Sequence, residues 1–367
     1  MLRAWGNPDG IVCLSVRSGF DLLLEALQLE PGDEVAFSAI THPDMVRIAE
    51  ARGLRVLPVD LDLKSLAPDS QALERALGPR TRLVVVAHLF GGLADLGHAA
   101  ALARRHGIVV VEDCAQSVRR PNDRGDANSD VSLFSFGAIK TATALGGALV
   151  RVGDADLAAR MRIRHETWPV QPRREYAVRT ATFVVLRALG QPRVYALFGR
   201  ALAATGRDLD AVVNGSVKGF PGSELTRRIR RRPSAPLLAL LARRLRRFDT
   251  ARLEARTDAG ERVAAALPAQ VRRPGQDAVD PTHWVFPVLA ADRDGLVSQL
   301  RRDGFDAATA TSSIDAVPAP QDRPDLRPTR AERAIAEVVF VPAYPELGDD
   351  ELDRLAESVA GALAEEG

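Results

Sequence analysis

The chain has 367 residues, of which 46% are hydrophobic and 26% charged, so it can build a packed core and is not a disordered protein. Its 49 basic and 48 acidic residues nearly cancel, and bulk charge predicts no nucleic-acid partner. Two cysteines exclude a disulfide framework, and without a CxxC pair we expect no metal. The N-terminus lacks an apolar signal-peptide core, and no apolar stretch approaches the ~20 residues of a membrane span, so we expect a soluble, cytoplasmic protein.

The first part of the chain alternates between helical and strand patterns. A helix is predicted from Ser18, as its N-cap, to Leu29, with Asp21 closing a capping box. Strand patterns follow at 35–37, 55–59, 83–87, 108–111, 131–136 and 147–152, and helical patterns at 44–51, 71–77 and 96–105. Continuous apolar strands separated by helices predict an α/β fold with a mostly parallel sheet covered by helices on both faces.

The remainder divides into an irregular segment and a second α/β pattern. Within 165–232, apolar residues at helical spacing from Val194 predict a helix that lies on the domain surface, on a partner or on a membrane. A single helical pattern then runs from Pro233 to about Leu267, and strand and helix patterns follow at 283–289, 293–303, 338–341 and 349–364. We therefore predict a large domain over 1–232, including the divergent segment 165–232, and a long connecting helix with a small C-terminal domain over 233–367.

Lysine is scarce in this sequence, which limits the candidates for amine chemistry to Lys64, Lys140 and Lys218. Arginine stays protonated and cannot form an imine at neutral pH. Lys140 follows an apolar strand and precedes a loop of small residues, where burial would lower its pKa and favour imine formation; the alternative is an ordinary surface lysine. Lys64 and Lys218 lie in polar, turn-rich contexts, for which the surface interpretation is favoured.

Two further patterns point to a ligand site. A strand at 109–111 runs into Asp113 at its carboxyl end, the edge where open parallel sheets bind ligands; the alternative is a turn or capping aspartate. The predicted helix start at Ser18-Gly19-Phe20 offers unpaired N–H groups that suit a phosphate. A phosphate site, a carboxylate for a pyridine nitrogen and an imine-forming lysine are the groups that pyridoxal phosphate needs.

Short motifs in a fixed order carry a resemblance that covers most of the chain outside about 165–225. They are Ser18-Gly19, Pro31-Gly32-Asp33-Glu34-Val35, Val59-Asp60-Leu61-Asp62, His88-Leu89-Phe90-Gly91, Glu112-Asp113-Cys114-Ala115-Gln116, Phe134-Ser135-Phe136 with Lys140, Gly146-Gly147 and Val341-Pro342-Ala343-Tyr344-Pro345-Glu346-Leu347. As a set they resemble the DegT-type sugar aminotransferase family, within the fold-type I pyridoxal-phosphate enzymes, and the chain would be a divergent member.

The resemblance implies a function and three catalytic or ring-binding roles. The enzyme would move an amino group from an amino acid, with glutamate as the expected donor, to a nucleotide-linked keto sugar in sugar biosynthesis. Lys140 would bind the cofactor covalently and move the proton, Asp113 would pair with the ring nitrogen, and Gln116 would hydrogen-bond the ring hydroxyl.

The resemblance also implies the remaining cofactor contacts. Ser18, Gly19, the backbone N–H of Phe20 and Ser135 would hold the phosphate. His42 falls where relatives stack an aromatic side chain on the ring; its alternative is a turn residue before a proline.

A homodimer with shared active sites is implied as well. Arg230 falls near the place of an asparagine that reaches the phosphate of the neighbouring subunit. Nine arginines between Arg227 and Arg247 form either a solvated helix face or, at 230–232, a site for phosphate or a substrate diphosphate.

Three other interpretations stay open. The first is another pyridoxal-phosphate reaction such as dehydration, against which Lys140 argues, because dehydrating relatives replace the lysine with histidine. The second is a more hydrophobic acceptor, or contact with a membrane surface, through the apolar residues of 165–232, among them Trp168, Tyr176, Phe183, Tyr195 and Phe198. The third is a cofactor-binding regulatory protein without turnover. A Rossmann nucleotide domain is disfavoured, because no GxGxxG follows the first strand.

Overall fold

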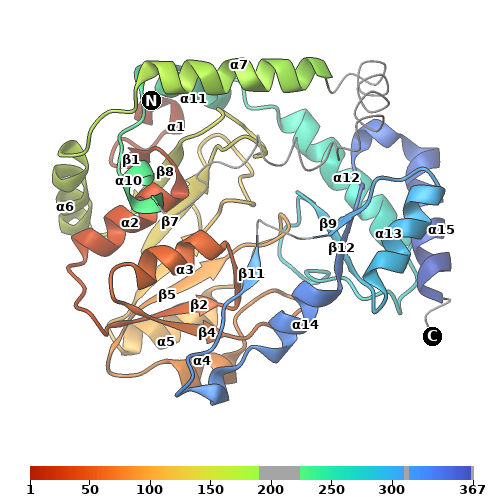
Figure 1. Cartoon of the computed structure of the whole chain (residues 1–367), viewed down its shortest axis with the longest axis horizontal. Helices are drawn as coiled ribbons and strands as arrows, with labels where there is room; N and C mark the ends of the chain where they lie inside the picture. Colours follow the sequence, from red (N-terminus) through yellow and green to blue (C-terminus); the bar gives the residue numbers. More distant parts are fainter. Residues whose placement is uncertain (190–223, 310–313, 365–367) are drawn as a thin grey trace.

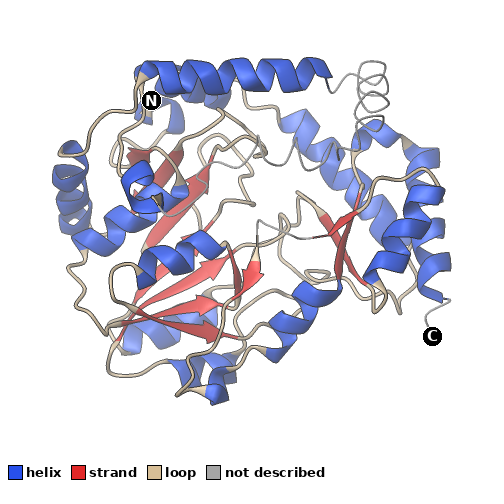
Figure 2. Ribbon diagram, viewed as in Figure 1, coloured by secondary structure: helices blue, strands red, loops and turns tan. Residues whose placement is uncertain are grey.

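A seven-stranded sheet forms the centre of the larger part of the molecule, at the left of Figures 1 and 2. The computed structural model describes residues 1–189, 224–309 and 314–364. The strands are, in spatial order, β1 (Ile11–Cys13), β8 (Ala148–Val152), β7 (Val131–Ser135), β6 (Val109–Asp113), β5 (Thr81–Ala87), β2 (Glu34–Ser38) and β4 (Arg55–Val59). Strand β8 is antiparallel to both its neighbours and the other pairings are parallel, so the predicted mostly parallel sheet is confirmed.

Helices bury both faces of this sheet, which explains the continuous apolar strands. Along β5, Leu83 and Val85 pack into one core with α2 (Val16–Ala26), α3 (Pro43–Glu50) and α6 (Ala155–Glu166). Val84 and Val86 point to the opposite face, against α4 (Ser70–Ala76) and α5 (Gly97–Arg105). Because successive side chains of a strand alternate between faces, a strand covered on both sides must be apolar at every position.

A three-stranded antiparallel sheet organises the smaller part, at the right of Figure 2. Its strands are β10 (Ala308–Thr309), β12 (Val338–Val341) and β9 (Phe286–Leu289), and its core includes side chains of α12 (Thr250–Ala266), α13 (Arg293–Arg302) and α15 (Asp349–Ala364). The other short elements are α1 (Leu2–Trp5), β3 (Ile40–Thr41), β11 (Asp315–Ala316), η1 (Pro324–Leu326), α14 (Thr329–Glu337) and η2 (Pro345–Leu347).

The connection between the two parts differs from the prediction of one helix from Pro233 to Leu267. The chain forms α11 (Ala235–Arg246), leaves the helical conformation at 247–249, and restarts as α12, whose first turn is capped by the Asp249 carboxylate. The apolar periodicity continues across this break, so the pattern alone did not reveal it. Leu241 and Leu245 of α11 pack with Trp5 and Phe134 of the large domain. We therefore propose the domain boundary at 247–249 rather than at 232.

The divergent segment contributes two described helices, α7 (Arg173–Leu189) and α10 (Leu225–Ile229). Trp168 and Tyr176 are buried in the chain's own core, and Phe183 is half-buried beneath the Arg179 guanidinium. The helix predicted from Val194, with Tyr195 and Phe198, lies outside the described residues, as does Lys218. Within the described ranges, no helix combines the length and hydropathy needed to cross a bilayer.

Candidate active site

A cavity of about 520 Å³ opens at the carboxyl ends of β6 and β7. Asp113 ends β6, Ser135 ends β7, and both line the cavity together with Lys140. The cavity is also lined by residues of α7 and of the segment around α10. The structure thus brings together at one sheet edge the carboxylate and the lysine that the sequence analysis singled out.

Asp113 is a buried carboxylate that lines this cavity, and few hydrogen bonds offset the cost of its burial. Its Oδ1 atom accepts the Ala115 N–H at 2.9 Å. Burial raises the pKa of Asp113, although this backbone bond and the positive charge of Lys140 act in the opposite direction. A carboxylate held in this way gains most from a cation that binds beside it.

Lys140 is correspondingly a lysine whose charged form is disfavoured. Burial lowers its pKa to about 8, against the attraction of Asp113. Its Nζ lies 4.1 Å from the centroid of the Trp284 ring, and the Trp284 indole N–H donates to the carbonyl oxygen of Ile139 at 3.2 Å. Sequence reasoning missed Trp284, since nothing in the pattern at 283–289 relates it to a loop 145 residues away.

The segment that carries Trp284 is fixed by the loop after β5. Gly91 has a φ of 95°, and a Cβ there would lie 2.5 Å from the Trp284 backbone nitrogen. Thr282 donates both its N–H and its hydroxyl to the Gly91 carbonyl oxygen at 3.0 Å. Only glycine permits this close approach at that backbone angle, so the loop after β5 sets the position of the indole over Lys140.

The helix start that faces the cavity lies three residues before the predicted one. Ser15, not Ser18, is the N-cap of α2, because its hydroxyl accepts the Ser18 N–H at 3.1 Å. Ser15, Val16 and Arg17 line the cavity. Ser15 was a second candidate N-cap in the sequence, but the pattern alone does not show which of the two serines begins the helix.

Ser18, Gly19 and Phe20 lie inside the first turns of α2 and are buried. The Phe20 ring packs edge-on against Phe37 in the core. The predicted capping-box partner, Asp21, instead accepts from Arg52 and Arg230. The phosphate roles of Ser18, Gly19 and Phe20 stay predictions.

His42 and Gln116 lie at or beside the cavity with part of their hydrogen-bonding capacity in use. His42 lines the cavity and also caps α3, with Nδ1 accepting the Asp44 N–H at 3.1 Å. Burial, and then the charge of Arg17, lowers the pKa of His42 to about 4, so its ring is neutral. The Gln116 side-chain oxygen accepts the Phe90 N–H at 2.8 Å. Their contacts with the ring stay predictions.

The cavity lining is rich in arginine. Five arginines contribute to it, against three carboxylates. The arginines are Arg17, Arg179, Arg227, Arg228 and Arg231, and the carboxylates are Asp113, Glu175 and Glu224. Sequence analysis placed the emphasis on Arg230, whose guanidinium binds the buried Asp21 carboxylate at 2.7 Å and ties the segment after α10 to α2.

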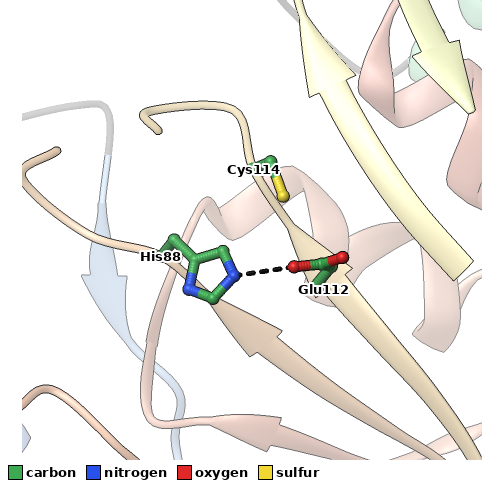
Figure 3. Close-up of side chains that lie close together, drawn as sticks. All are labelled: His88, Glu112 and Cys114. Atoms are coloured by element: carbon green, nitrogen blue, oxygen red, sulfur yellow. Dashed lines mark hydrogen bonds and ion pairs between the residues drawn. The ribbon is translucent and has the colours of Figure 1, made fainter. Parts of the chain in front are cut away.

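The residues that flank Asp113 in the sequence, Glu112 and Cys114, form a buried group with His88 (Figure 3). His88 Nδ1 accepts the Ala94 N–H, so Nε2 carries the proton and donates it to Glu112 at 2.9 Å. The other Glu112 oxygen accepts from Asp126 N–H and the Ser129 hydroxyl. Burial opposes ionisation of Glu112, but its bond to His88 and the remaining hydrogen bonds outweigh burial and lower its pKa. These bonds make the group a support for the end of β6.

Comparison with known proteins identifies a family that the sequence around this site matches. Residues 3–183 match the DegT/DnrJ/EryC1/StrS aminotransferase family. Over these residues, just under half of the chain, the sequence is similar to that family. The match to the DegT/DnrJ/EryC1/StrS family confirms the expected enzyme class, a pyridoxal-phosphate-dependent aminotransferase, and its expected cofactor.

Solved structures of similar proteins confirm the expected fold. The aminotransferase TlmJ from Streptoalloteichus hindustanus is 22% identical with a TM-score of 0.70, over 100% of this chain and 89% of that one. NtdA from Bacillus subtilis, with bound cofactor PMP, is 19% identical with a TM-score of 0.68, over 97% and 73%. The sugar aminotransferase CalS13 from Micromonospora echinospora is 21% identical with a TM-score of 0.66, over 98% and 89%.

The residues that line this cavity fit pyridoxal phosphate. Asp113 is desolvated and would accept a protonated ring nitrogen. Lys140 has an amine that loses its proton near neutral pH, as imine formation requires. The N-terminus of α2 at Ser15 faces the same cavity and would favour a phosphate.

Proposed function

We propose that the protein transfers the amino group of glutamate to a keto sugar that is linked to a nucleotide. The family supports amino transfer as the reaction. The observation that carries the proposal is the pairing, in one cavity, of a lysine with a pKa of about 8 and a desolvated carboxylate. These are the two groups that amino transfer at a pyridine ring requires.

The chain's own residues would bind and position, while the cofactor supplies the reactive carbonyl and an electron-withdrawing ring. Lys140 Nζ, held near Trp284 and largely shielded from water, would carry the proton that moves between the substrate carbon and the cofactor. Asp113 would keep the ring nitrogen protonated. The first turn of α2, from Ser15 to Arg17, would orient the phosphate.

The arginines that line the cavity support the nucleotide linkage. Arg179, Arg228 and Arg231 line the same cavity as Asp113. Arg231 pairs with Glu175 at 2.7 Å, and an incoming diphosphate would compete for its guanidinium. An acceptor that carries two phosphate charges suits this excess of positive charge better than a free sugar does.

We also propose a homodimer with shared active sites, on the strength of the family resemblance. Sedimentation velocity tests it directly: a species of twice the 39.5 kDa chain mass is expected. A monomer that turns over would contradict it.

The function is tested by labelling and by half-reaction. Borohydride reduction of the reconstituted protein, followed by peptide mapping, should place the label on Lys140. Addition of glutamate to unreduced protein should convert the visible absorption to that of the amine form and release 2-oxoglutarate. Lys140→Arg should lose both signals, whereas the exposed Lys64→Arg should retain them. Label on Lys64 or Lys218, or no response to any amino donor, would refute the proposal.

A further inference from the structure

Helix α7 presents an apolar face to the outside of the molecule. The exposed side chains along one side of it are Ala177, Val178, Ala181, Val184, Val185 and Ala188, at spacings of one, three and four that place them on one helical face. Val178 is 58% exposed, Val184 64% and Val185 56%. In Figure 1, α7 runs along the top edge of the molecule.

The opposite side of α7 already makes the contacts that hold the helix to the large domain. Tyr176 is buried there and donates its hydroxyl to the Ala144 carbonyl oxygen at 2.8 Å. The Arg179 guanidinium donates to the Leu145 carbonyl oxygen. The outward valines are therefore not needed to fix α7, and a surface helix would ordinarily carry polar residues at those positions.

Arginines lie near the ends of α7 and on the helix that packs beside it. Arg173, Arg174 and Arg187 are exposed near the two ends of α7. Its one acidic residue, Glu175, is paired with Arg231. The neighbouring helix α11, which packs beside α7 at the same edge of the molecule, adds exposed arginines at 243, 244 and 246.

We propose that α7, with the arginines of α11, docks the protein on an anionic lipid bilayer. An apolar helix face flanked by arginines is the pattern of a helix that lies in the membrane interface, with its apolar side chains among the acyl boundary and its cations at the headgroups. This requires no spanning helix and does not depend on the proposed reaction. Because Glu175 and Arg179 also line the cavity, the docked helix holds the mouth of the active site close to the membrane surface.

Charge favours a bilayer over a second copy of the chain on this face. Two copies that met through α7 would bring the arginines of both α7 and both α11 helices together, and like charges at a desolvated interface oppose association. Anionic headgroups meet the same arginines with complementary charge, and the strength of that attraction falls as salt rises.

Flotation of the full-length holoenzyme with vesicles tests the proposal. Vesicles of phosphatidylcholine with one third phosphatidylglycerol should carry the protein to the top of the gradient, and pure phosphatidylcholine vesicles should not. V184D/V185D should reduce the floated fraction about tenfold, because two carboxylates then enter the interface. R243Q/R244Q should weaken partitioning about fivefold per arginine and flatten its salt dependence.

A matched control separates the α7 face from general surface hydrophobicity. Ile163 on α6 is also an exposed apolar side chain, 69% exposed, and I163D should float like the wild type. The proposal is overturned if the wild type stays at the bottom with anionic vesicles, or if V184D/V185D floats undiminished. It is also overturned if V184D/V185D dissociates an oligomer in sedimentation velocity while flotation is unchanged, since the face would then join two copies.

Discussion

Replacing Asp113 by asparagine should separate ring activation from structural support. The substitution keeps the size of the side chain and an oxygen for the Ala115 N–H, but it removes the charge beside the proposed ring position. Since Asp113 raises the pKa of Lys140, the variant should move that pKa below about 8. A lysine with that pKa is neutral in about one molecule in ten at pH 7, so this change can raise the neutral fraction by at most about tenfold.

Loss of the ring-nitrogen partner acts in the other direction and is larger. We expect the half-reaction with glutamate to slow by about 10²-fold or more, or about 2.7 kcal/mol of lost barrier reduction. Stopped-flow absorbance under single-turnover conditions measures this rate, and the pH dependence of amine modification of Lys140 in the cofactor-free protein measures the fall in the lysine pKa. Near wild-type rates would show that Asp113 merely caps the turn at Ala115.

A control for the capping role exists in the loop between β5 and α5. Asp95 is exposed, and its carboxylate accepts the Gly97 N–H at 2.8 Å, the same bond across two residues that Asp113 makes. Asp95→Asn should leave the half-reaction unchanged.

Gly91→Ala should destabilise the fold by about 3 kcal/mol in urea unfolding, because φ is positive there and the new Cβ would clash with the Trp284 backbone. Gly107→Ala, which also has a positive φ but open space around the new Cβ, should cost about 1 kcal/mol. Equal costs for the two variants would contradict the close approach at Gly91. His88→Ala should cost about 3 kcal/mol at pH 7 because it strips a partner from the buried Glu112 carboxylate. The lowered pKa of Glu112 means that its stabilisation is complete above its unfolded value of 4.5 and is lost as pH falls, so the gap between variant and wild type should shrink below pH 4.5 in thermal melts; a constant gap would refute this. Arg230→Gln should lower stability by about 2 kcal/mol without changing cofactor affinity by equilibrium dialysis, and a tenfold loss of affinity would instead favour its phosphate role.

The sheet was predictable because its physical signal is local. Each strand of the parallel core is covered on both faces, so it reads as a short apolar run, and the polar residue that ends it marks the ligand edge. Asp113 and Lys140 follow such runs directly, and the structure places both in the cavity.

Other features depend on information that a single pattern does not hold. Ser15 and Ser18 are equally good capping residues, and only the packing of α2 decides between them. The break after Arg246 lies in a stretch whose apolar spacing continues without interruption. The valines of α7 recur at helical spacing, but periodicity does not say which side of a helix faces the core. Here the side with Tyr176 packs on the core, and the side with the valines is exposed.

The contact between Lys140 and Trp284 has a consequence for how this protein can be recombined or redesigned. The lysine comes from the large domain and the indole from the segment that leads into the small one, and that segment packs closely on Gly91 of the large domain. A chimera that joins this large domain to the small domain of a distant relative would keep Asp113 and Lys140, yet it would replace the indole that contacts the amine. The C-terminal domain therefore has to be inherited together with the lysine that it covers.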